Sequence, residues 1–243
     1  MLQLLKKEIN SFFSSLIGYI VIIVFLLATA LFLWVFPGEF NILDGGYATL
    51  DPLFVLAPWV FLFLVSAVTM RLFSDEKKSG TIELLFTKPF TDLQIIIAKY
   101  LSGIVLVLFS LIPTLVYFIS VYLLGSETGN LDIGGTAGSY FGLFFLAAIY
   151  VSIGLFASSI TENQIIAFLL GLILCFFFYI GFELISGLSF LENISELILN
   201  IGINEHYKSM SRGVIDLRDL IYFISMVIVF LFGTKTVLES RKW

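Results

Sequence analysis

Few side chains in this sequence could carry out chemistry. The 243 residues include one cysteine, Cys175, and one histidine, His206. A single cysteine allows no disulfide within the chain, and one histidine cannot build a zinc site, which needs three or four clustered ligands. The sequence also lacks the GxxxxGK[ST] phosphate loop, the GxSxG nucleophile elbow and the HExxH zinc motif. We therefore expect a chain that is not itself an enzyme and that binds no metal, nucleotide or other cofactor.

The composition indicates where such a chain resides. Hydrophobic residues make up 59% of the sequence and charged residues 13%, whereas soluble domains average roughly 45–50% and about 25%. A soluble protein could not cover its surface with so few polar groups. The net charge of −5 also argues against a nucleic-acid partner. The sequence therefore predicts an integral membrane protein in a lipid bilayer.

The hydrophobic pattern predicts an all-α fold with six membrane spans. A helix that crosses the hydrocarbon core needs about 20 mostly apolar residues. Pro113, in the third and longest span, should introduce a kink or tilt. The six expected spans cover residues 17–36, 53–73, 95–124, 140–160, 165–185 and 220–238.

The distribution of lysine and arginine predicts the orientation of the spans. Ten basic residues flank the spans on one side and three on the other. Because basic residues are retained on the cytoplasmic side, both termini should be cytoplasmic. The ten are Lys6, Lys7, Arg71, Lys77, Lys78, Lys88, Lys99, Lys235, Arg241 and Lys242.

Residues 1–16 should form an amphipathic helix on the membrane surface. Leu2, Leu5, Ile9, Phe12 and Leu16 recur at spacings of three and four, which places them on one helical face. This helix could be an anchor alone, or a lever that also contacts a cytoplasmic partner.

The cytoplasmic loop 74–91 carries the highest density of charge in the chain. Gly80 and Thr81 suit a helix start, and the sequence Lys88-Pro89 disfavours continuation, so a helix of under two turns is expected. Four bulky apolar residues stand in this charged loop: Ile82, Leu84, Leu85 and Phe86. They either contact a partner, which we favour, or fold back onto the ends of the spans.

Short polar motifs should cap several helices. Thr91 to Gln94 and Thr161 to Gln164 read as capping boxes, and Asp216 with Asp219 as an acidic start to the last span. Gly138 and Gly142 have GxxxG spacing, which suits either a close helix contact or a flexible loop.

A third amphipathic segment, 186–218, lies on the external side. Leu191, Ile194, Ile198 and Ile201 recur at helical spacing, which fits a short helix or a re-entrant pair that dips into the outer leaflet. Glu183, near the outer end of the fifth span, should extend towards the interface.

Three motifs together resemble ABC-2 type transporter permeases. The first runs from Arg71 to Pro89 and includes Arg71, Glu76, Gly80, Thr81, Glu83, Leu84, Leu85, Thr87 and Pro89. The second is Gly154 to Gln164. The third joins His206-Tyr207 to Arg212-Gly213-Val214-Ile215-Asp216 and Asp219. Within the family the chain most resembles the gliding-motility-associated permease subunit, through its opening residues Leu5 to Phe13 and the third motif.

The resemblance implies a single ABC-2 type transmembrane domain over residues 1–243 in the bacterial inner membrane. A separate ABC ATPase subunit would bind ATP and Mg²⁺. A second copy of the chain, or a related permease or auxiliary membrane subunit, would complete the complex, which would export an unknown substrate. The alternative is a membrane scaffold that anchors an ATPase or motility complex and transports nothing.

The expected functional residues fall into three groups. ATPase coupling is assigned to Glu76, Lys77, Lys78, Gly80, Thr81, Ile82, Glu83, Leu84, Leu85, Phe86 and Pro89. A second cytoplasmic turn comprises Thr161, Glu162, Asn163 and Gln164. An external gate region includes Glu183, Leu191, Ile198, His206, Arg212, Asp216 and Asp219.

Overall fold

The computed structural model describes residues 1–87, 89–213 and 216–240, and this part of the chain is entirely helical apart from its connections. The first half contains α1 Leu2–Ser14, α2 Leu16–Trp34, α3 Ile42–Gly45, α4 Asp51–Thr69, α5 Arg71–Lys78, α6 Thr81–Phe86, α7 Asp92–Leu111, the 3₁₀ turn η1 Ile112–Thr114 and α8 Leu115–Leu124. The second half contains α9 Ile133–Ile160, α10 Gln164–Phe176, the π-helix η2 Phe177–Gly181, α11 Phe182–Ser186, the 3₁₀ helix η3 Ser189–Ile194, α12 Ser195–Leu199, α13 Ile203–Met210 and α14 Leu217–Glu239.

The prediction of an all-α protein with membrane-spanning helices is confirmed. Within the described residues, five helical segments are long and apolar enough to cross a bilayer, and the bent pair α1–α2 is a candidate sixth. The five cover Asp51–Lys78, Asp92–Leu124, Ile133–Ile160, Gln164–Ser186 and Leu217–Glu239. Pro113 lies in the 3₁₀ turn between α7 and α8, where the missing proline N–H was expected to disturb the helix.

A sharp bend separates α1 from α2. The two helices meet at 65°, and the chain is extended at Ser15 between them. A Cβ on Gly18 would lie 2.6 Å from the carbonyl oxygen of Phe12. The absence of a side chain at Gly18 therefore lets the start of α2 approach the end of α1.

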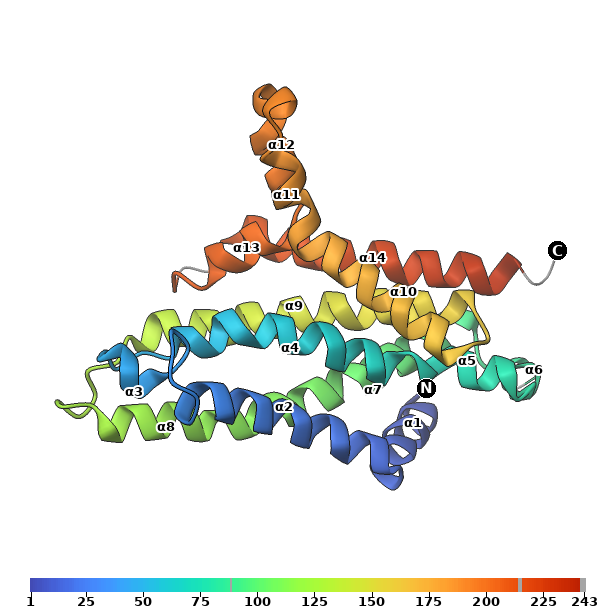
Figure 1. Cartoon of the computed structure of the whole chain (residues 1–243). Coiled ribbons are helices and arrows are strands. Elements are labelled where there is room, and N and C mark those ends of the chain that lie inside the picture. The colour runs from blue at the N-terminus through green and yellow to red at the C-terminus, as the bar shows by residue number, and fades with distance from the viewer. Residues whose placement is uncertain (88, 214–215, 241–243) are drawn as a thin grey trace.

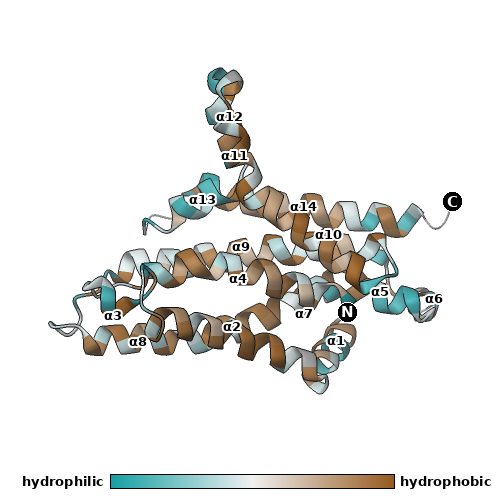
Figure 2. Ribbon diagram, viewed as in Figure 1, coloured by the Kyte–Doolittle hydropathy of each residue, from teal (hydrophilic) through white to brown (hydrophobic). Residues whose placement is uncertain are grey.

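Helix α9 forms the centre of the bundle, with α4, α7, α10, α13 and α14 packed around it (Figure 1). In its most apolar stretch 78% of residues are buried, against 17% in α14. Close packing at this centre depends on Gly154, where a Cβ would lie 2.0 Å from Oγ1 of Thr69 on α4. Figure 2 shows apolar residues along the length of the bundle and polar ones concentrated on α5 and α13.

The two ends of the bundle differ. One end, here called the terminal end, holds α1, α5, α6 and the C-terminal end of α14. The opposite end holds α3, α13 and the connection between α8 and α9 (Figure 1). Helices α11 and α12 project from the bundle as a spur, and α13 returns to pack on α9.

The helix of the second span extends further than expected. It was predicted to end at residue 73, but α5 continues the same helical segment to Lys78. The charged residues 74–78 are therefore part of a helix that begins in the bundle. Movement of this stretch is consequently tied to movement of α4.

Candidate functional site

One hydroxyl group joins the α4–α5 corner to the central helix. Ser158 of α9 accepts hydrogen bonds from the backbone N–H groups of Phe73 (3.0 Å) and Ser74 (3.1 Å), and it donates one to the Met70 carbonyl at 2.9 Å. The N–H groups in the first turn of a helix lack partners within that helix. Ser158 satisfies two of them inside the protein, where water cannot.

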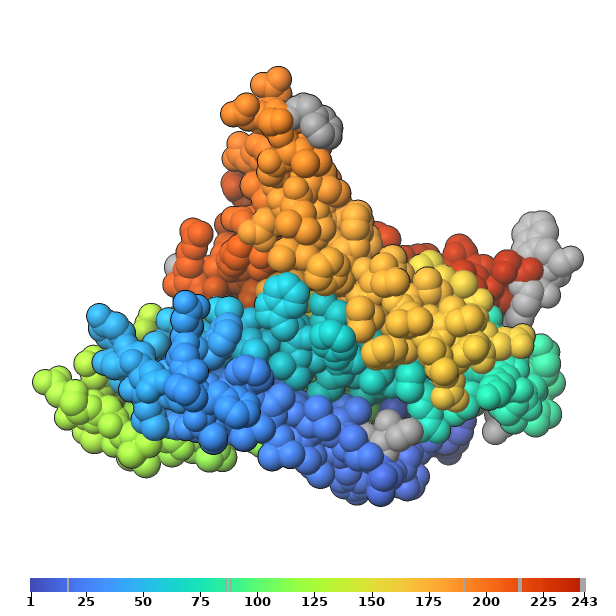
Figure 3. Space-filling model, in the orientation of Figure 1, coloured from blue at the N-terminus to red at the C-terminus, as the bar shows by residue number. Residues whose placement is uncertain are grey.

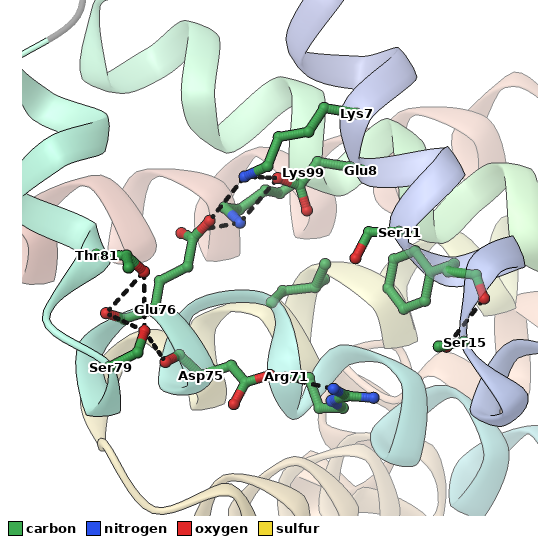
Figure 4. A pocket seen from close by; sticks show the side chains of 12 residues that line it. Lys7, Glu8, Ser11, Ser15, Arg71, Asp75, Glu76, Ser79, Thr81 and Lys99 are labelled. Carbon is green, nitrogen blue, oxygen red and sulfur yellow. Dashed lines mark hydrogen bonds and ion pairs between the residues drawn. The ribbon is translucent and has the colours of Figure 1, made fainter.

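Four charged side chains meet where α1, α5 and α7 converge, and we call them the charge cluster: Lys7, Glu8, Glu76 and Lys99 (Figure 4). Nζ of Lys99 lies 3.0 Å from Oε2 of Glu76 and 3.3 Å from Oε1 of Glu8. Nζ of Lys7 lies 3.3 Å from Glu8 and 3.4 Å from Glu76. Two lysines and two glutamates give no net charge.

Burial makes this cluster a strong constraint on geometry. The Lys99 side chain is 1% exposed and that of Glu8 8%. The Lys99 ammonium also stands over the ring of Phe73 at 5.2 Å. A buried ion is costly unless it is paired, so α1, α5 and α7 are held in one relative arrangement. Burial alone would lower the pKa of Lys7, but the Glu8 and Glu76 carboxylates outweigh it and raise that pKa.

A polar cavity of about 450 Å³ opens beside the charge cluster. Its wall also includes Arg71, Ser79 and Thr81 (Figure 4). The carboxylate of Asp75, another wall residue, is engaged on both oxygens, by Arg71 at 3.2 Å and by the side-chain amide of Gln164 at 2.5 Å. The charges around this cavity are thus largely paired with one another.

Helix α5 is also attached to the turn between α9 and α10. Lys77 donates a hydrogen bond to the carbonyl oxygen of Ser159 at 2.5 Å, and the Asp75–Gln164 contact lies beside it. The structure therefore brings the predicted coupling segment and the predicted second cytoplasmic turn together. Glu76 and Lys77, which the sequence assigned to partner contacts, instead contact α1, α7 and α9, and Asp75 beside them contacts α10.

Helix α6 presents a narrower surface than expected. It starts after Gly80, whose φ of +69° suits glycine, and it has the predicted length. Ile82 and Leu85 are buried against the chain itself, whereas Leu84 is 65% exposed. The expectation that all four apolar residues face a partner is therefore wrong for Ile82 and Leu85, because positions three apart on a helix share a face. The Phe86 side chain lies outside the described part of the structure.

The exposed residues around Leu84 are polar, apart from Pro89. Thr81 and Glu83 of α6, Lys78 of α5 and Pro89 in the following connection all reach the surface. Glu76 and Lys77 were expected to orient a partner, but they instead make the internal contacts described above. The surface available to a partner thus consists of Leu84 with its polar neighbours.

Two capping predictions have different outcomes. Thr91 and Gln94 form the expected capping box at the start of α7. The box predicted from Thr161 to Gln164 is wrong, because Asn163 caps α10 through the Ile165 N–H and Gln164 reaches Asp75. Thr161 accepts a bond from the Asn163 N–H, and Glu162 is exposed.

At the opposite end, α13 is tied to its neighbours by side chains of the predicted gate region. Nδ1 of His206 lies 2.7 Å from Oδ1 of Asp219 on α14, and the imidazole stacks on Tyr222 at 3.8 Å. Asp219 lies in the first turn of α14, as expected, and at 5% exposure it is also a buried partner of His206. Asp216 caps α14 as expected, accepting a hydrogen bond from the Arg218 N–H.

The other gate residues lie apart from this pair. Glu183 on α11 accepts hydrogen bonds from Asn204 at 2.6 Å and Lys208 at 3.2 Å. Leu191 and Ile198 belong to η3 and α12 of the spur, and Arg212 is exposed just after α13. The predicted gate residues therefore divide between α13 with its contacts and the projecting spur.

Sequence reasoning missed Glu8, Lys99 and Ser158 as contact residues. The buried stripe of α1 is Leu4, Glu8 and Phe12, whereas Leu2 is 80% exposed. The predicted apolar face was therefore only partly correct, since α1 packs on α7 through a stripe that includes a glutamate. A lysine inside an otherwise apolar span, as at position 99, was the available signal that a carboxylate from another helix should lie nearby.

The helices and their apolar surfaces define a multi-pass membrane protein. Comparison with known protein families identifies the family. Residues 49–241 match the model of the ABC-2 family transporter proteins, and the chain belongs to that family. Such permeases are the membrane component of ABC transporters and work with an ABC ATPase. No curated protein matches the chain.

Proposed function

We propose that this chain is the permease subunit of an exporter in which a separate ATPase acts through α5 and α6. The observation that carries the proposal is the attachment of α5. This helix continues the second span and is fixed to α1 and α7 by the charge cluster, while the adjoining α6 exposes Leu84 at the surface. A force applied to α6 would therefore reach the bundle through α5.

In this mechanism the ATPase subunit binds ATP and Mg²⁺ and covers Leu84. Glu83 and Lys78 beside it would select the partner by charge, since charged rims govern specificity more than affinity. When two ATPase subunits close, α5 and α6 would be displaced, and the charge cluster and Ser158 would transmit that movement to α1, α7 and α9.

Further features of the assembly follow from the family and the sequence pattern. Five or six spans suit half of a transporter, so we propose a homodimer or a pair with a related permease. The basic residues at the terminal end support cytoplasmic termini in a bacterial inner membrane. The link to gliding motility rests on the resemblance of residues 5–13 and of the His206–Asp219 motif.

The coupling proposal can be tested by changing Leu84 in membranes from cells that express the tagged chain. Leu84→Asp should abolish copurification of an ATPase that carries a phosphate-binding loop. Leu43→Asp is a matched control, because Leu43 is also 65% exposed but lies in α3 at the opposite end. Retention of the ATPase by Leu84→Asp would refute the proposed contact.

A second experiment separates an exporter from a scaffold. The copurified complex is reconstituted in vesicles, and ATP hydrolysis is measured with and without candidate lipid and glycan cargo. Stimulation by one cargo supports export. A rate that is indifferent to every cargo, with Leu84 still required for assembly, supports the scaffold.

A further inference from the structure

Two cavities along α4 share one residue. The first, of about 420 Å³ at the opposite end, lies between α4, η2, α11 and α13. The second, of about 460 Å³, lies deeper between α2, α4 and α10. Trp59 lines both. Figure 3 shows α4, in cyan, at the surface between α2 in blue and α10 in yellow-orange.

The two cavities differ in chemistry. The deeper one is lined only by apolar side chains: Ile20, Val21, Val24, Trp59, Val60, Phe63, Leu64, Ala67 and Phe168. The outer one has apolar walls that include Phe54 and Ile180, with Asp51, Glu183, Asn204 and Lys208 among its polar lining residues. The two cavities therefore follow one another along α4, with polar residues in the outer one and apolar side chains in the deeper one.

The polar lining is poor in cations and retains hydrogen-bonding capacity. Asp51 and Glu183 contribute two carboxylates, and Lys208 alone contributes a cation, which is already paired with Glu183 at 3.2 Å. Among the described residues, the Tyr179 hydroxyl and the Trp59 indole N–H have no hydrogen-bond partner, although Tyr179 is only 5% exposed. The Tyr179 oxygen retains some exposure and Trp59 is 37% exposed, so both groups can donate a hydrogen bond to a ligand in the outer cavity.

The dimensions match one lipid. Twelve residues separate Val55 in the outer cavity from Ala67 in the deeper one, which is about 18 Å at 1.5 Å per helical residue. Half of a hydrocarbon core of about 30 Å is roughly 15 Å. A lipid acyl chain lying along this path would thus reach approximately the middle of the bilayer.

We propose that these two cavities together bind one amine-headed phospholipid of the outer leaflet. The ammonium group is held by Asp51 and Glu183, the lipid phosphate faces Lys208, and an acyl chain passes Trp59 into the apolar groove. A second copy of the chain is the competing occupant. A lipid fits better because the two carboxylates and one lysine that line the outer cavity complement an ammonium group next to a phosphate.

This site rests on the membrane placement in the proposed function and is independent of the ATPase contact. The test uses the full chain in nanodiscs that contain phosphatidylethanolamine with a photoreactive acyl chain, and the labelled peptides are mapped by mass spectrometry. The equivalent phosphatidylglycerol probe reports binding without the amine. Labelling around Phe232, which is 56% exposed on α14, reports ordinary surrounding lipid.

The expected result is labelling of residues 59–67 and 20–24 by the ethanolamine probe in preference to the glycerol probe. Asp51→Asn with Glu183→Gln should reduce this labelling roughly tenfold, the effect of losing a charge-assisted hydrogen bond, and leave labelling near Phe232 unchanged. Glu205→Gln, an exposed change on α13 outside the cavity, should have no effect.

Three results would overturn the proposal. These are equal labelling by the two probes, labelling unaffected by the double substitution, and chain-to-chain crosslinks from a photoreactive residue at position 59 in place of lipid adducts. If the double variant does not fold, Asp51→Asn alone can replace it, because this substitution leaves the Glu183 contacts to Asn204 and Lys208 intact. Labelling by the ethanolamine probe should then still decrease. Copurification of the ATPase, measured on the same variants, reports separately on the proposed function.

Discussion

The buried ammonium of Lys99 lies 3.0 Å from Glu76, on a helix that continues from a different membrane span. Glu76 follows α4 on α5, whereas Lys99 belongs to α7. The contact therefore fixes the position of α5 relative to the third predicted span. Glu8 on α1 makes the second contact to the same ammonium group, at 3.3 Å.

Lys99→Met should destabilise the protein by about 3–5 kcal/mol, because removal of one member of a buried ion pair leaves its partners uncompensated. At roughly 2–4 °C per kcal/mol for a chain of this size, the Tm in detergent should fall by about 6–20 °C. Adding Glu8→Gln and Glu76→Gln should restore most of the loss. An unchanged Tm for Lys99→Met would show that the cluster contributes nothing to stability.

The contribution of Lys7 should depend on pH only in alkaline solution. Its pKa is raised in the folded chain, from an ordinary value of 10.5. Its stabilisation should therefore be complete below 10.5 and be lost as the pH rises through the higher folded value. The difference in Tm between the parent chain and Lys7→Met should stay constant from neutral pH to 10.5 and disappear above it. A difference that grows with alkalinity would contradict the assignment.

Ser158→Ala should weaken the α4–α5 corner. The substitution leaves the N–H groups of Phe73 and Ser74 without their acceptor in a buried region, at an expected cost of about 1–3 kcal/mol. Amide hydrogen exchange should accelerate at those two residues. Ser225→Ala on exposed α14, whose hydroxyl bonds only to the Tyr222 carbonyl, serves as the control. Equal exchange in both variants would rule out a special role for Ser158.

Gly138→Ala should displace the end of α13. The added Cβ would lie 2.6 Å from the Met210 carbonyl oxygen and 2.9 Å from Cα of Gly213, so backbone must move. Overpacking of this kind costs typically 1–3 kcal/mol. Thermal unfolding, with proteolysis at residues 186–218 as a second readout, would measure it. Gly134→Ala meets only the Asp132 side chain at 3.4 Å and should be tolerated; similar behaviour of the two variants would contradict the packing argument.

His206→Ala should loosen α13 from α14, because it leaves the buried Asp219 carboxylate without the imidazole 2.7 Å away. An unpaired buried charge destabilises strongly, and hydrogen exchange across Ile203–Met210 should increase. Glu205→Gln, an exposed change next to it, should leave exchange unchanged. Protection of α13 that survives His206→Ala would show that the pair is not its attachment.

The sequence determined the class of protein and most of its helices. Because a bilayer requires long apolar helices, hydropathy alone located the spans, and the lysine and arginine distribution predicts their orientation. Local chemistry located the Thr91 capping box, the Asp216 cap and the short helix after Gly80, since these involve residues close in the chain.

Only the tertiary structure decided which polar residues face inward. The charge cluster joins residues 7–8, 76 and 99 from three helices, and Ser158 reaches a corner 84 residues away in the sequence. The same packing buried Ile82 and Leu85 and left Leu84 exposed. Such outcomes depend on how helices are rotated and packed against one another. A helical repeat in the sequence specifies which residues share a face of a helix, but it does not specify which other helix that face contacts.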